Sequence, residues 1–531
     1  MLRIINMRVL LDTNTTINKL AAKRLKLPPQ AVLEVVIVRR AVDARRKNNI
    51  SFVYTLDVKT AVPEGQVLSR LKGDKDVSQV PEFVPEPFIK GLKKLEHPPV
   101  VIGLGPAGML AALTLAKHGY RPLVLERGRK IEERTKDVSK FWQTGNFDPI
   151  SNVQFGEGGA GTFSDGKLTT RVNDPLMRQV LELFVEAGAP EEITYLHKPH
   201  IGTDKLRDVV KNIRREIIAL GGQVEFEAKV TNVDIKDGQL KGLVVNENRY
   251  IPCSVALLGI GHSARDTYEM LHKQGVAMEA KAFAIGVRIE HPQDVIDVSQ
   301  YGISAGHPQL PAADYALVYH DKDAGRTAYS FCMCPGGLVV AASSETGGVV
   351  TNGMSLYNRA SGVANSALVV NVTPEDFGNE ILGGIAFQRK YEQLAFSVGG
   401  SNYHAPLQTV GDFLAGTTGN TTFITKPSYR PGTVATDLRQ CLPQFVTDTL
   451  AKALPEFERK IKGFAHPEAI MTGVETRTSA PVRIIRKKDF ISLNTEGLYP
   501  IGEGAGYAGG IMSAALDGLN SAIAIIKQYK V

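Results

Sequence analysis

The strongest constraint on the fold is a glycine-rich turn between an apolar strand and a helix rich in Ala and Leu. Residues 99–128 read PVVIGLGPAGMLAALTLAKHGYRPLVLERG, with Gly103, Gly105 and Gly108 in G-x-G-x-x-G spacing. A second apolar strand, PLVLE, ends at Glu126, 18 residues past the last glycine. A strand before the turn, a helix after it and an acid at this distance together predict a dinucleotide-binding β-α-β unit.

The three glycines have different roles in such a unit. Gly103 permits the tight turn, Gly105 lets the main chain approach a pyrophosphate, and Gly108 lets the helix pack closely on the strand. Free N–H groups and a partial positive charge at the helix N-terminus favour a phosphate. Glu126 can accept both hydroxyls of an adenosine ribose, which disfavours NADP because of its 2′-phosphate. NAD and FAD share this pattern, and other segments must decide between them.

A second glycine-rich stretch, GEGGAGTFSDGKL at residues 156–168, holds five glycines. Glycine weakens helices and strands, so one explanation is a flexible surface loop. The other is a ligand so close to the main chain that Cβ atoms would collide with it. In that case the exposed N–H groups form an anion-binding nest, and Thr162 and Ser164 add hydroxyl donors. We favour the ligand, because FSDGKL is typical of a defined turn into a strand.

Two further segments complete the pattern. Residues 223–261 predict a strand, a three-stranded meander with its turn at Asp237-Gly238, and an apolar strand that ends at Gly261. Near the C-terminus, GLYPIGEGAGYAGGIMSAALDGLNSAIAII predicts a strand, a turn at residues 502–504 and an Ala-rich helix that starts near Gly510. These elements would add strands to the same sheet.

With these residues in view, the sequence resembles FAD-containing enzymes of the glutathione-reductase-like superfamily. More closely, it is similar to the bacterial family usually labelled FAD-dependent dehydrogenase, whose substrate is unassigned. The resemblance runs from about residue 99 to the end, and the N-terminal module also fits. Its matching stretches are GLGPAGMLAALTLAKHGYRPLVLERG, QFGEGGAGTFSDGKLTTR, HIGTDKL, LLGIGHSARDTYEML, FAIGVRIEHPQ, SFCMCPGG, VVTNGMSLYNR and ETRTSAPVRI.

The resemblance implies FAD as the cofactor. Glu126 would then hold the ribose, the main chain of Val230 would meet the adenine, and the helix from Ile511 would point its N-terminus at the flavin. Superfamily members carry Gly-Asp at the C-terminal turn, whereas this chain carries Gly502-Glu503, one methylene longer. The expected cofactor-binding set is Gly103, Gly105, Pro106, Ala107, Gly108, Glu126, Arg127, Gly158, Gly159, Ala160, Gly161, Thr162, Ser164, Asp165, Gly166, Val230, Gly261, Gly502, Glu503, Gly510 and Ile511.

The expected fold class is α/β. A Rossmann-like FAD-binding domain, with a parallel sheet and a three-stranded β-meander, would carry an inserted α+β substrate domain and a small N-terminal α+β module. The expected boundaries place the N-terminal module at 1–95, the FAD-binding domain at 96–270 and 471–531, and the substrate domain at 271–470. The proline-rich stretch 80–88 is typical of a linker.

An alternative interpretation gives the chain a second nucleotide site. VALLGIGHSARDTYEML can be parsed as G-x-G-x-x-A over Gly259, Gly261 and Ala264, with Arg265 placed for a phosphate. Its distance from the meander instead suits the strand that returns to FAD, and no second β-α-β unit with an acid follows. NAD(P)H is therefore expected at most as a transient electron donor.

The substrate domain contributes the candidate catalytic residues. Cys332 and Cys334 stand two apart in SFCMCPGG, so on a regular strand they face the same side. They are either buried structural cysteines, a redox pair or a nucleophile. No further ligands at metal spacing accompany them, which disfavours zinc, and we predict no metal site.

Polar clusters between apolar strands supply further candidates. Arg288 and Arg477 can clamp a carboxylate or phosphate, or form interdomain salt bridges. We name both, with Cys332 and Cys334, as catalytic candidates. The weaker candidates around them are His291, Asn352, Arg359, His404 and Thr478.

Charge is unevenly distributed along the chain of 531 residues. Residues 1–95 hold 18 Lys and Arg against 9 Asp and Glu, whereas the other 436 hold 44 against 46. The run RRAVDARRK, followed by Phe52 and Tyr54, suggests a nucleic-acid face or a solvated strand. The function we expect is an FAD-dependent oxidoreductase that transfers a hydride between flavin and a small organic substrate. The alternatives are a flavin-containing RNA-binding or sensing protein and a reductase of isoprenoid or lipid chains.

Composition narrows the class of protein that we expect. A hydrophobic content of 43% and a charged content of 22% are ordinary for a globular protein, and no apolar run is long enough to span a bilayer. Four cysteines and no secretory signal suit a cytoplasmic protein. We expect a small-molecule substrate, no membrane partner and nucleic acid only through residues 1–95. The oligomeric state is not readable from the sequence.

Overall fold

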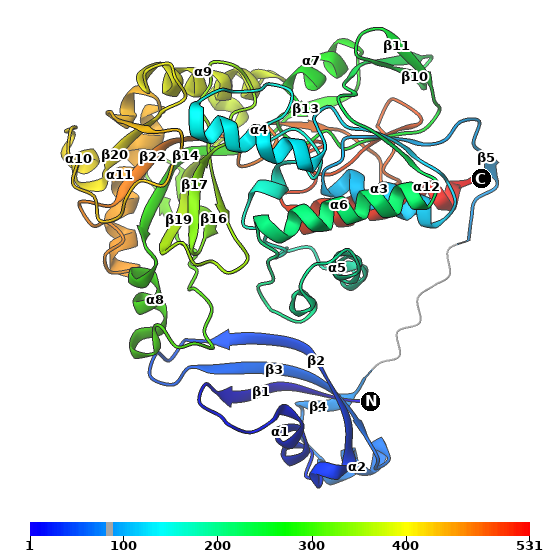
Figure 1. Cartoon of the computed structure of the whole chain (residues 1–531), viewed down its shortest axis with the longest axis vertical. Helices are drawn as coiled ribbons and strands as arrows, with labels where there is room; N and C mark the ends of the chain where they lie inside the picture. Colours follow the sequence, from blue (N-terminus) through cyan, green and yellow to red (C-terminus); the bar gives the residue numbers. More distant parts are fainter. Residues whose placement is uncertain (81–88) are drawn as a thin grey trace.

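A computed structural model of the chain describes residues 1–80 and 89–531. Of the predicted linker at 80–88, all but Val80 lies outside the described residues. No helix in the described ranges is long and apolar enough to cross a membrane. Figure 1 shows a large body with a smaller N-terminal lobe beneath it.

The N-terminal lobe is a four-stranded antiparallel sheet with two helices. Its elements are β1 (Leu2–Leu10), α1 (Ile17–Arg24), β2 (Val32–Asp43), β3 (Ser51–Thr60), α2 (Glu64–Arg70) and β4 (Val77–Gln79), with a short 3₁₀ turn at Pro29–Ala31. The strand order is β2-β3-β1-β4. This combination of strands and helices is the α+β module expected at the N-terminus. Alternate residues of the strands, such as Leu56 and Val58, form a buried core of their own.

The lobe joins the body through the edge strand β2, which is the strand nearest to the body in Figure 1. The amide of Arg40 donates to the carbonyl of Tyr195 at 2.7 Å, and the amide of His197 donates to the carbonyl of Arg40 at 2.9 Å. The Arg40 guanidinium also lies over the rings of Phe52 and Tyr195. Phe52 packs into the main core of the body. Phe52 and Arg40 are therefore engaged in this contact rather than in the suggested nucleic-acid face.

A five-stranded parallel sheet forms the centre of the Rossmann-like domain. Its order is β24-β12-β6-β7-β8, with bounds β6 (Val100–Ile102), β7 (Leu123–Leu125), β8 (Gln223–Glu225), β12 (Ala256–Leu258) and β24 (Leu498–Pro500). Side chains alternate between its two faces. Val101 packs toward α3 (Pro106–Lys117), α6 (Thr203–Ala219) and α12 (Ile511–Gln528). Val100 and Ile102 pack toward the opposite face.

The opposite face of this sheet carries the predicted meander. Its strands are β9 (Val230–Lys236), β10 (Gln239–Val245) and β11 (Arg249–Pro252), paired in the order β11-β10-β9. The helix α7 (Arg265–Lys273) contacts β9 beside it. The Rossmann-like α/β architecture expected from the sequence is thus confirmed.

The strand β12 settles the question of a second nucleotide domain. It pairs in parallel with β6 and β24 inside the single five-stranded sheet. Arg265, proposed for a phosphate, is 1% exposed and forms a salt bridge with Glu392 at 2.8 Å. The separate NAD(P) domain is therefore wrong, because β12 is the strand that returns to the first sheet.

The second domain is built on a seven-stranded sheet in the order β15-β16-β19-β14-β22-β20-β21. The bounds are β14 (Phe283–Pro292), β15 (Val318–Asp321), β16 (Arg326–Cys334), β19 (Val363–Val372), β20 (Ala405–Thr409), β21 (Thr433–Ala435) and β22 (Ile470–Glu475). A ribbon of β17 (Gly337–Ala341) and β18 (Thr351–Ser355) lies beside it. The sheet runs past the boundary expected at residue 470, because β22 continues to Glu475.

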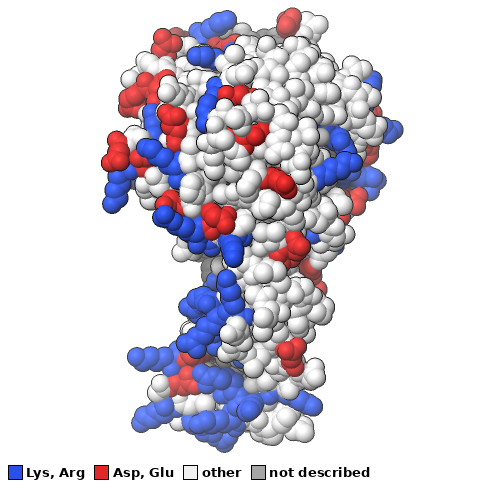
Figure 2. All heavy atoms as spheres, turned by 90° about the vertical axis from the view of Figure 1, so that its left-hand side faces the viewer, with Lys and Arg blue, Asp and Glu red and all other residues white. Residues whose placement is uncertain are grey.

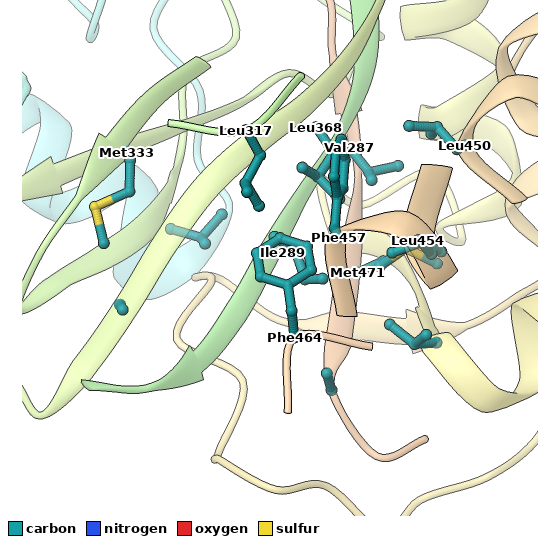
Figure 3. Packing of buried hydrophobic residues seen from close by; sticks show 14 of the residues in the cluster. Val287, Ile289, Leu317, Met333, Leu368, Leu450, Leu454, Phe457, Phe464 and Met471 are labelled. Atoms are coloured by element: carbon teal, nitrogen blue, oxygen red, sulfur yellow. The ribbon is translucent and has the colours of Figure 1, made fainter. Parts of the chain in front are cut away.

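The core of this domain lies between the sheet and the helix α11 (Gln444–Lys460). Figure 3 shows Val287 and Ile289 from β14 meeting Leu454 and Phe457 from α11, with Phe464 closing the group. The other helices of this domain are α8 (Gln293–Tyr301), α9 (Gly383–Val398) and α10 (Val410–Ala415). All of the named core side chains are essentially inaccessible to solvent.

The remaining elements connect these units. They are β5 (Lys93–Lys94), α4 (Ile131–Thr144), α5 (Met177–Glu186), β13 (Met278–Ala280), β23 (Val482–Ile484) and β25 (Tyr529–Lys530), with 3₁₀ turns at Ala160–Phe163, Glu191–Thr194, Gly302–Ser304, Pro374–Phe377 and Leu438–Gln440. The two-residue strands β5 and β25 pair in parallel, so the C-terminus lies beside residues 93–94.

A buried acid in the seven-stranded sheet gives a testable pH dependence. Glu290 on β14 accepts from the amide and hydroxyl of Ser428, and its Oε2 has no hydrogen-bond partner among the described residues. Burial raises the pKa of Glu290 from 4.5 to about 7. The folded state therefore keeps a proton that the unfolded state loses, so this stabilisation is complete below pH 4.5 and is lost as pH rises toward 7.

We expect Glu290→Gln to remove this dependence. At 1.36 kcal/mol per pKa unit, Glu290 accounts for about 3 kcal/mol of stability lost between roughly pH 4.5 and 7.5. Urea unfolding gives the free energy of unfolding of wild type and variant at pH 5 and at pH 7.5. The loss between the two pH values should be larger in wild type than in the variant, and the difference is the contribution of Glu290. If wild type and variant lose the same stability between these pH values, Glu290 is not the source of the pH dependence.

Candidate functional site

A cavity of about 560 Å³ lies between the Rossmann-like domain and the seven-stranded sheet. One side is formed by the G-x-G-x-x-G turn, the glycine loop, the start of the meander and the C-terminal turn. The other side is formed by residues of β16, β18 and β22. The predicted residues that line it are Gly103, Gly105, Pro106, Ala107, Glu126, Arg127, Gly159, Ala160, Gly161, Ser164, Asp165, Gly166, Val230, Gly261, Gly502, Glu503, Gly510 and Ile511.

The turn at the start of α3 has the local geometry that its glycines predicted. Gly103 adopts a left-handed φ of +92°, which favours glycine. A Cβ on Gly105 would meet nothing closer than the Cα of Gly159 at 3.8 Å, so its open side faces the cavity. Gly108 does not line the cavity. A Cβ there would lie 1.9 Å from the carbonyl oxygen of Gly103, so Gly108 serves helix packing.

The carboxylate of Glu126 joins separate backbone segments on the Rossmann-like side of the cavity. Its Oε2 accepts from the amide of Leu104 at 2.8 Å, and its Oε1 accepts from the amides of Gly128 at 2.9 Å and Gly156 at 3.1 Å. A carboxylate has about four accepting positions, so one remains for a ligand hydroxyl. The expectation that Glu126 accepts two ribose hydroxyls is thereby corrected to one, because three positions tie the first turn to the glycine loop.

The glycine loop is fixed in place. The buried guanidinium of Arg134 on α4 donates to the carbonyls of Asn152, Val153 and Gly159, each at 2.9 Å, and also to those of Gly156 and Glu157. Three of these carbonyls belong to the glycine loop and two to the residues just before it, so the loop is fixed and the surface-loop alternative fails. Sequence reasoning missed Arg134, because nothing in the helical stretch IEERTK marks one arginine as buried.

Two predicted members of the loop point away from the cavity. A Cβ on Gly158 would lie 2.0 Å from Oγ1 of Thr162 and close to Val210 of α6. Thr162 is itself buried, and its hydroxyl is not exposed to the cavity. Gly158 and Thr162 are therefore corrected to packing residues, because the 3₁₀ turn at residues 160–163 rotates them toward α6.

The C-terminal turn places an acid and a helix start at the cavity. Burial raises the pKa of Glu503 to about 7, and the nearby charge of Lys281 opposes this shift. Asp517 of α12 accepts from the amide of Gly502 at 2.6 Å and pairs with Arg486. The side chain of Ile511 packs where a Cβ on Gly161 would lie, at 2.9 Å. Glycine is thus required at residue 161 for the glycine loop to approach α12.

The far side of the cavity carries polar residues beside apolar ones such as Phe331 and Met333. The polar residues there include Cys332 of β16 and Asn352 of β18. They also include Glu475 at the end of β22, and Arg477 and Thr478 just after it. The sequence had not indicated Lys167, His262 or Tyr315, which also line it. These residues come from segments far apart in the chain, so no local motif could have grouped them.

The two cysteines do not face the same side, contrary to the expectation. Across from β19, Phe331 pairs with Ala367 and Cys334 pairs with Asn365, so β16 has one extra residue in a β-bulge. Cys332 takes a left-handed φ of +44° and lines the cavity, whereas Cys334 is fully buried. The bulge breaks the two-residue alternation on which the expectation depended.

Arg288 and Arg477 are both held by carboxylates. Arg288 is fully buried, does not line the cavity and forms a two-bond pair with Glu475 at 3.0 and 2.9 Å. Arg288 is therefore corrected from a catalytic candidate to an internal structural residue. Arg477 reaches the cavity, yet its guanidinium donates to Glu392 at 2.8 and 3.0 Å.

The remaining polar candidates lie outside the cavity or are paired across it. Arg359 bonds both carboxylate oxygens of Asp165, at 3.0 and 2.6 Å, and so links the second domain to the glycine loop. His291 is fully buried against Phe464, and burial lowers its pKa to about 4. His404 does not line the cavity either. Neither histidine is placed to exchange protons with a ligand there.

Comparison with known proteins places the chain in a family. Residues 282–478 match a family model described as "FAD-dependent protein, C-terminal domain-like", and residues 1–59 match a domain of unknown function. An uncharacterized protein of Clostridium beijerinckii is 50% identical over 532 residues, with 99% of each chain covered. The chain belongs to this protein's family. The alignment with this relative spans the N-terminal lobe as well as the body.

Solved structures of low similarity include CtdE in complex with FAD, at 12% identity and a TM-score of 0.33, covering 80% of this chain and 83% of CtdE. A geranylgeranyl bacteriochlorophyll reductase-like protein from Thermoplasma acidophilum matches at 11% identity and a TM-score of 0.34, covering 81% of this chain and 78% of its own. The cofactor of the family is FAD, by the description of the matching model. The cavity fits it, because its glycines open the main chain to a diphosphate and Glu126 keeps one accepting position.

Proposed function

We propose that this protein is an FAD-dependent oxidoreductase of the dehydrogenase type, which transfers a hydride between flavin and a small polar organic substrate. One observation carries the proposal. The cavity that begins at Gly105 and Glu126 continues to Cys332, Asn352 and Glu475 of the second domain. A substrate held at the polar side and a cofactor held by the glycine turns would share one enclosed space.

Bound FAD supplies a two-electron acceptor and donor, and the chain binds, orients and shields it. Gly103 and Gly105 would admit the diphosphate, and the N-terminus of α12 would direct its partial positive charge at the flavin ring. Arg134 keeps the glycine loop rigid, so the loop needs no ordering when the cofactor binds. Residues of the seven-stranded sheet border the cavity from the other side.

The polar side of the cavity opposes reduction of isoprenoid or other lipid chains. Lys167, Glu475 and Arg477 line the space that an apolar chain would need. Burying an alkyl chain against charged side chains leaves those charges poorly solvated, which costs free energy. A substrate that carries a carboxylate, carbonyl or amide matches this lining better.

The basic N-terminal lobe supports a second candidate function, nucleic-acid binding. Figure 2 shows Lys and Arg side chains gathered over this lobe, in line with the charge excess of residues 1–95. Binding of the full chain to an RNA oligonucleotide should then weaken steeply as salt rises. Absence of binding at low salt would remove this candidate. As part of the first proposal, the protein is cytoplasmic and belongs to the glutathione-reductase-like superfamily.

The purified protein is expected to be yellow, with absorbance near about 450 nm from oxidised flavin. Under anaerobic conditions NADH, NADPH and a panel of polar metabolites are added in turn, and loss of that absorbance identifies the reductant. Colourless protein that fails to take up added FAD would contradict the cofactor assignment. Flavin that no donor reduces, and whose reduced form no acceptor oxidises, would contradict the oxidoreductase.

A further inference from the structure

The bulge in β16 gives Cys332 a special position. Extra residues in a strand redirect a side chain and are common next to active sites. A left-handed φ of +44° is strained for a residue with a Cβ, and such strain persists only where the surroundings hold it. Here the strained residue is the cysteine that reaches the cavity, while the ordinary strand position behind it carries the buried Cys334.

The buried guanidinium of Arg288 holds the bulge and a neighbouring amide together. It donates to the carbonyl of Cys332 at 2.9 Å and to Oδ1 of Asn352 at 3.1 Å. Oδ1 of Asn352 also accepts from the amide of Gly353 at 2.8 Å. A side-chain amide atom that accepts hydrogen bonds from two N–H groups must be the oxygen. The other terminal atom of the Asn352 amide is therefore the nitrogen, Nδ2.

The amide group Nδ2 of Asn352 is therefore a fixed donor. It has no acceptor within residues 1–80 and 89–531, and Asn352 lines the same cavity as Cys332. A donor whose partner is missing and whose orientation is set by Arg288 suits a ligand oxygen. Gly353 makes this possible, because a Cβ there would lie 2.4 Å from Nη1 of Arg288.

The charges around the sulfur favour its ionised form. The neighbouring Cys334 side chain, with the charges of Arg288 and Lys167, lowers the pKa of the Cys332 thiol below its usual range despite its partial burial. The opposing carboxyl groups that face it are Asp165, Glu475 and Glu503. Asp165 is paired with Arg359 and Glu475 with Arg288, which reduces their effect.

We propose that Cys332 is a nucleophilic thiolate that adds to the carbonyl carbon of an aldehyde substrate, with Nδ2 of Asn352 donating to the carbonyl oxygen. This names the substrate class of the proposed oxidoreductase and so rests on that function. In the step, the sulfur forms a C–S bond and the π pair of C=O moves to oxygen. Oxygen then takes a proton from water, giving a hemithioacetal and hydroxide, with no change in oxidation state. The product keeps its C–H bond in the cavity that FAD shares.

Alkylation of the FAD-loaded protein by iodoacetamide, followed by peptide mass spectrometry, tests the thiolate. The buried Cys253 and Cys441 are controls within the same chain, since burial raises the pKa of each to about 12. We expect Cys332 to be labelled first, with a rate that changes less than about threefold between pH 6 and pH 8. An unshifted thiol would change about seventyfold over that range.

Two variants and an aldehyde probe complete the test. Cys334→Ala should slow labelling of Cys332 at pH 6 by several-fold, because the neighbouring side chain that favours the thiolate is lost. Propionaldehyde should protect Cys332 from iodoacetamide, and Asn352→Ala should weaken this protection about tenfold without slowing the alkylation itself. Labelling of Cys332 no faster than the two buried cysteines, or equal protection in Asn352→Ala, would overturn the proposal. Flavin absorbance of the same samples reports separately on the oxidoreductase.

Discussion

Gly105→Val is expected to yield folded protein that has lost FAD. The backbone of Gly105 has φ −79° and ψ −176°, which a β-branched residue adopts without strain. A Cβ there meets only the Cα of Gly159, at 3.8 Å, so the larger side chain extends into the cavity. If the diphosphate lies against this turn, valine occupies its place. We expect FAD affinity to fall by at least about a hundredfold, or roughly 2.7 kcal/mol.

Flavin content per chain and thermal unfolding of the apoprotein separate binding from folding in this variant. Gly65→Ala is the matched control, because Gly65 in α2 also has open space around its Cβ position and lies in the N-terminal lobe. That variant should keep full flavin content. Wild-type FAD affinity in Gly105→Val would show that the diphosphate does not lie at this turn.

Arg288→Met is expected to destabilise the protein by about 3–5 kcal/mol, the effect of removing one partner from a buried ion pair. Arg288 is inaccessible to solvent and bonds Glu475, the carbonyl of Cys332 and the side chains of Asn352 and Asn365. Methionine fills much of the volume and supplies no donor. Among the described residues, only the hydroxyl of Thr351 would then remain to bond the buried Glu475 carboxylate.

Urea unfolding of Arg288→Met measures this loss, and the double variant Arg288→Met with Glu475→Met tests its cause. Because the double variant leaves no uncompensated charge, it should recover most of the lost stability. Arg178→Ala provides a control, since Arg178 forms an exposed i,i+4 pair with Glu182 at 2.8 Å. That change should cost less than about 0.5 kcal/mol. A loss below about 1 kcal/mol in Arg288→Met would contradict the proposed role of the guanidinium.

The cofactor side of the site was largely predictable because its determinants are local. Gly103, Gly105 and Gly108 lie within six residues, and each spacing has one geometric purpose in a strand-turn-helix unit. The same holds for the helix that starts at Ile511, which follows a run of glycines and small residues. Local patterns also gave the meander, since strands joined by short turns carry their pairing partners beside them.

The substrate side was less predictable because its contacts join distant residues. Arg288 meets Glu475 at a separation of 187 residues, and Arg359 meets Asp165 at 194. Arginines in such a segment look alike in sequence, whether they bind a ligand or a carboxylate. The direction of Cys332 was misjudged for a related reason, because a bulge depends on the register with β19 and leaves no mark in SFCMCPGG.

The sequence by itself determined the Rossmann-like unit and a dinucleotide as its ligand, because spacing and periodicity are properties of neighbouring residues. The choice of FAD came with the resemblance to a known family. Only the tertiary structure decided that β12 belongs to the first sheet, that Arg134 clamps the glycine loop, and that Cys332 and Asn352 share a cavity. Those facts depend on which faces pack together and in what register. Burial and hydrogen bonding across the whole fold select that arrangement, and no local stretch encodes it.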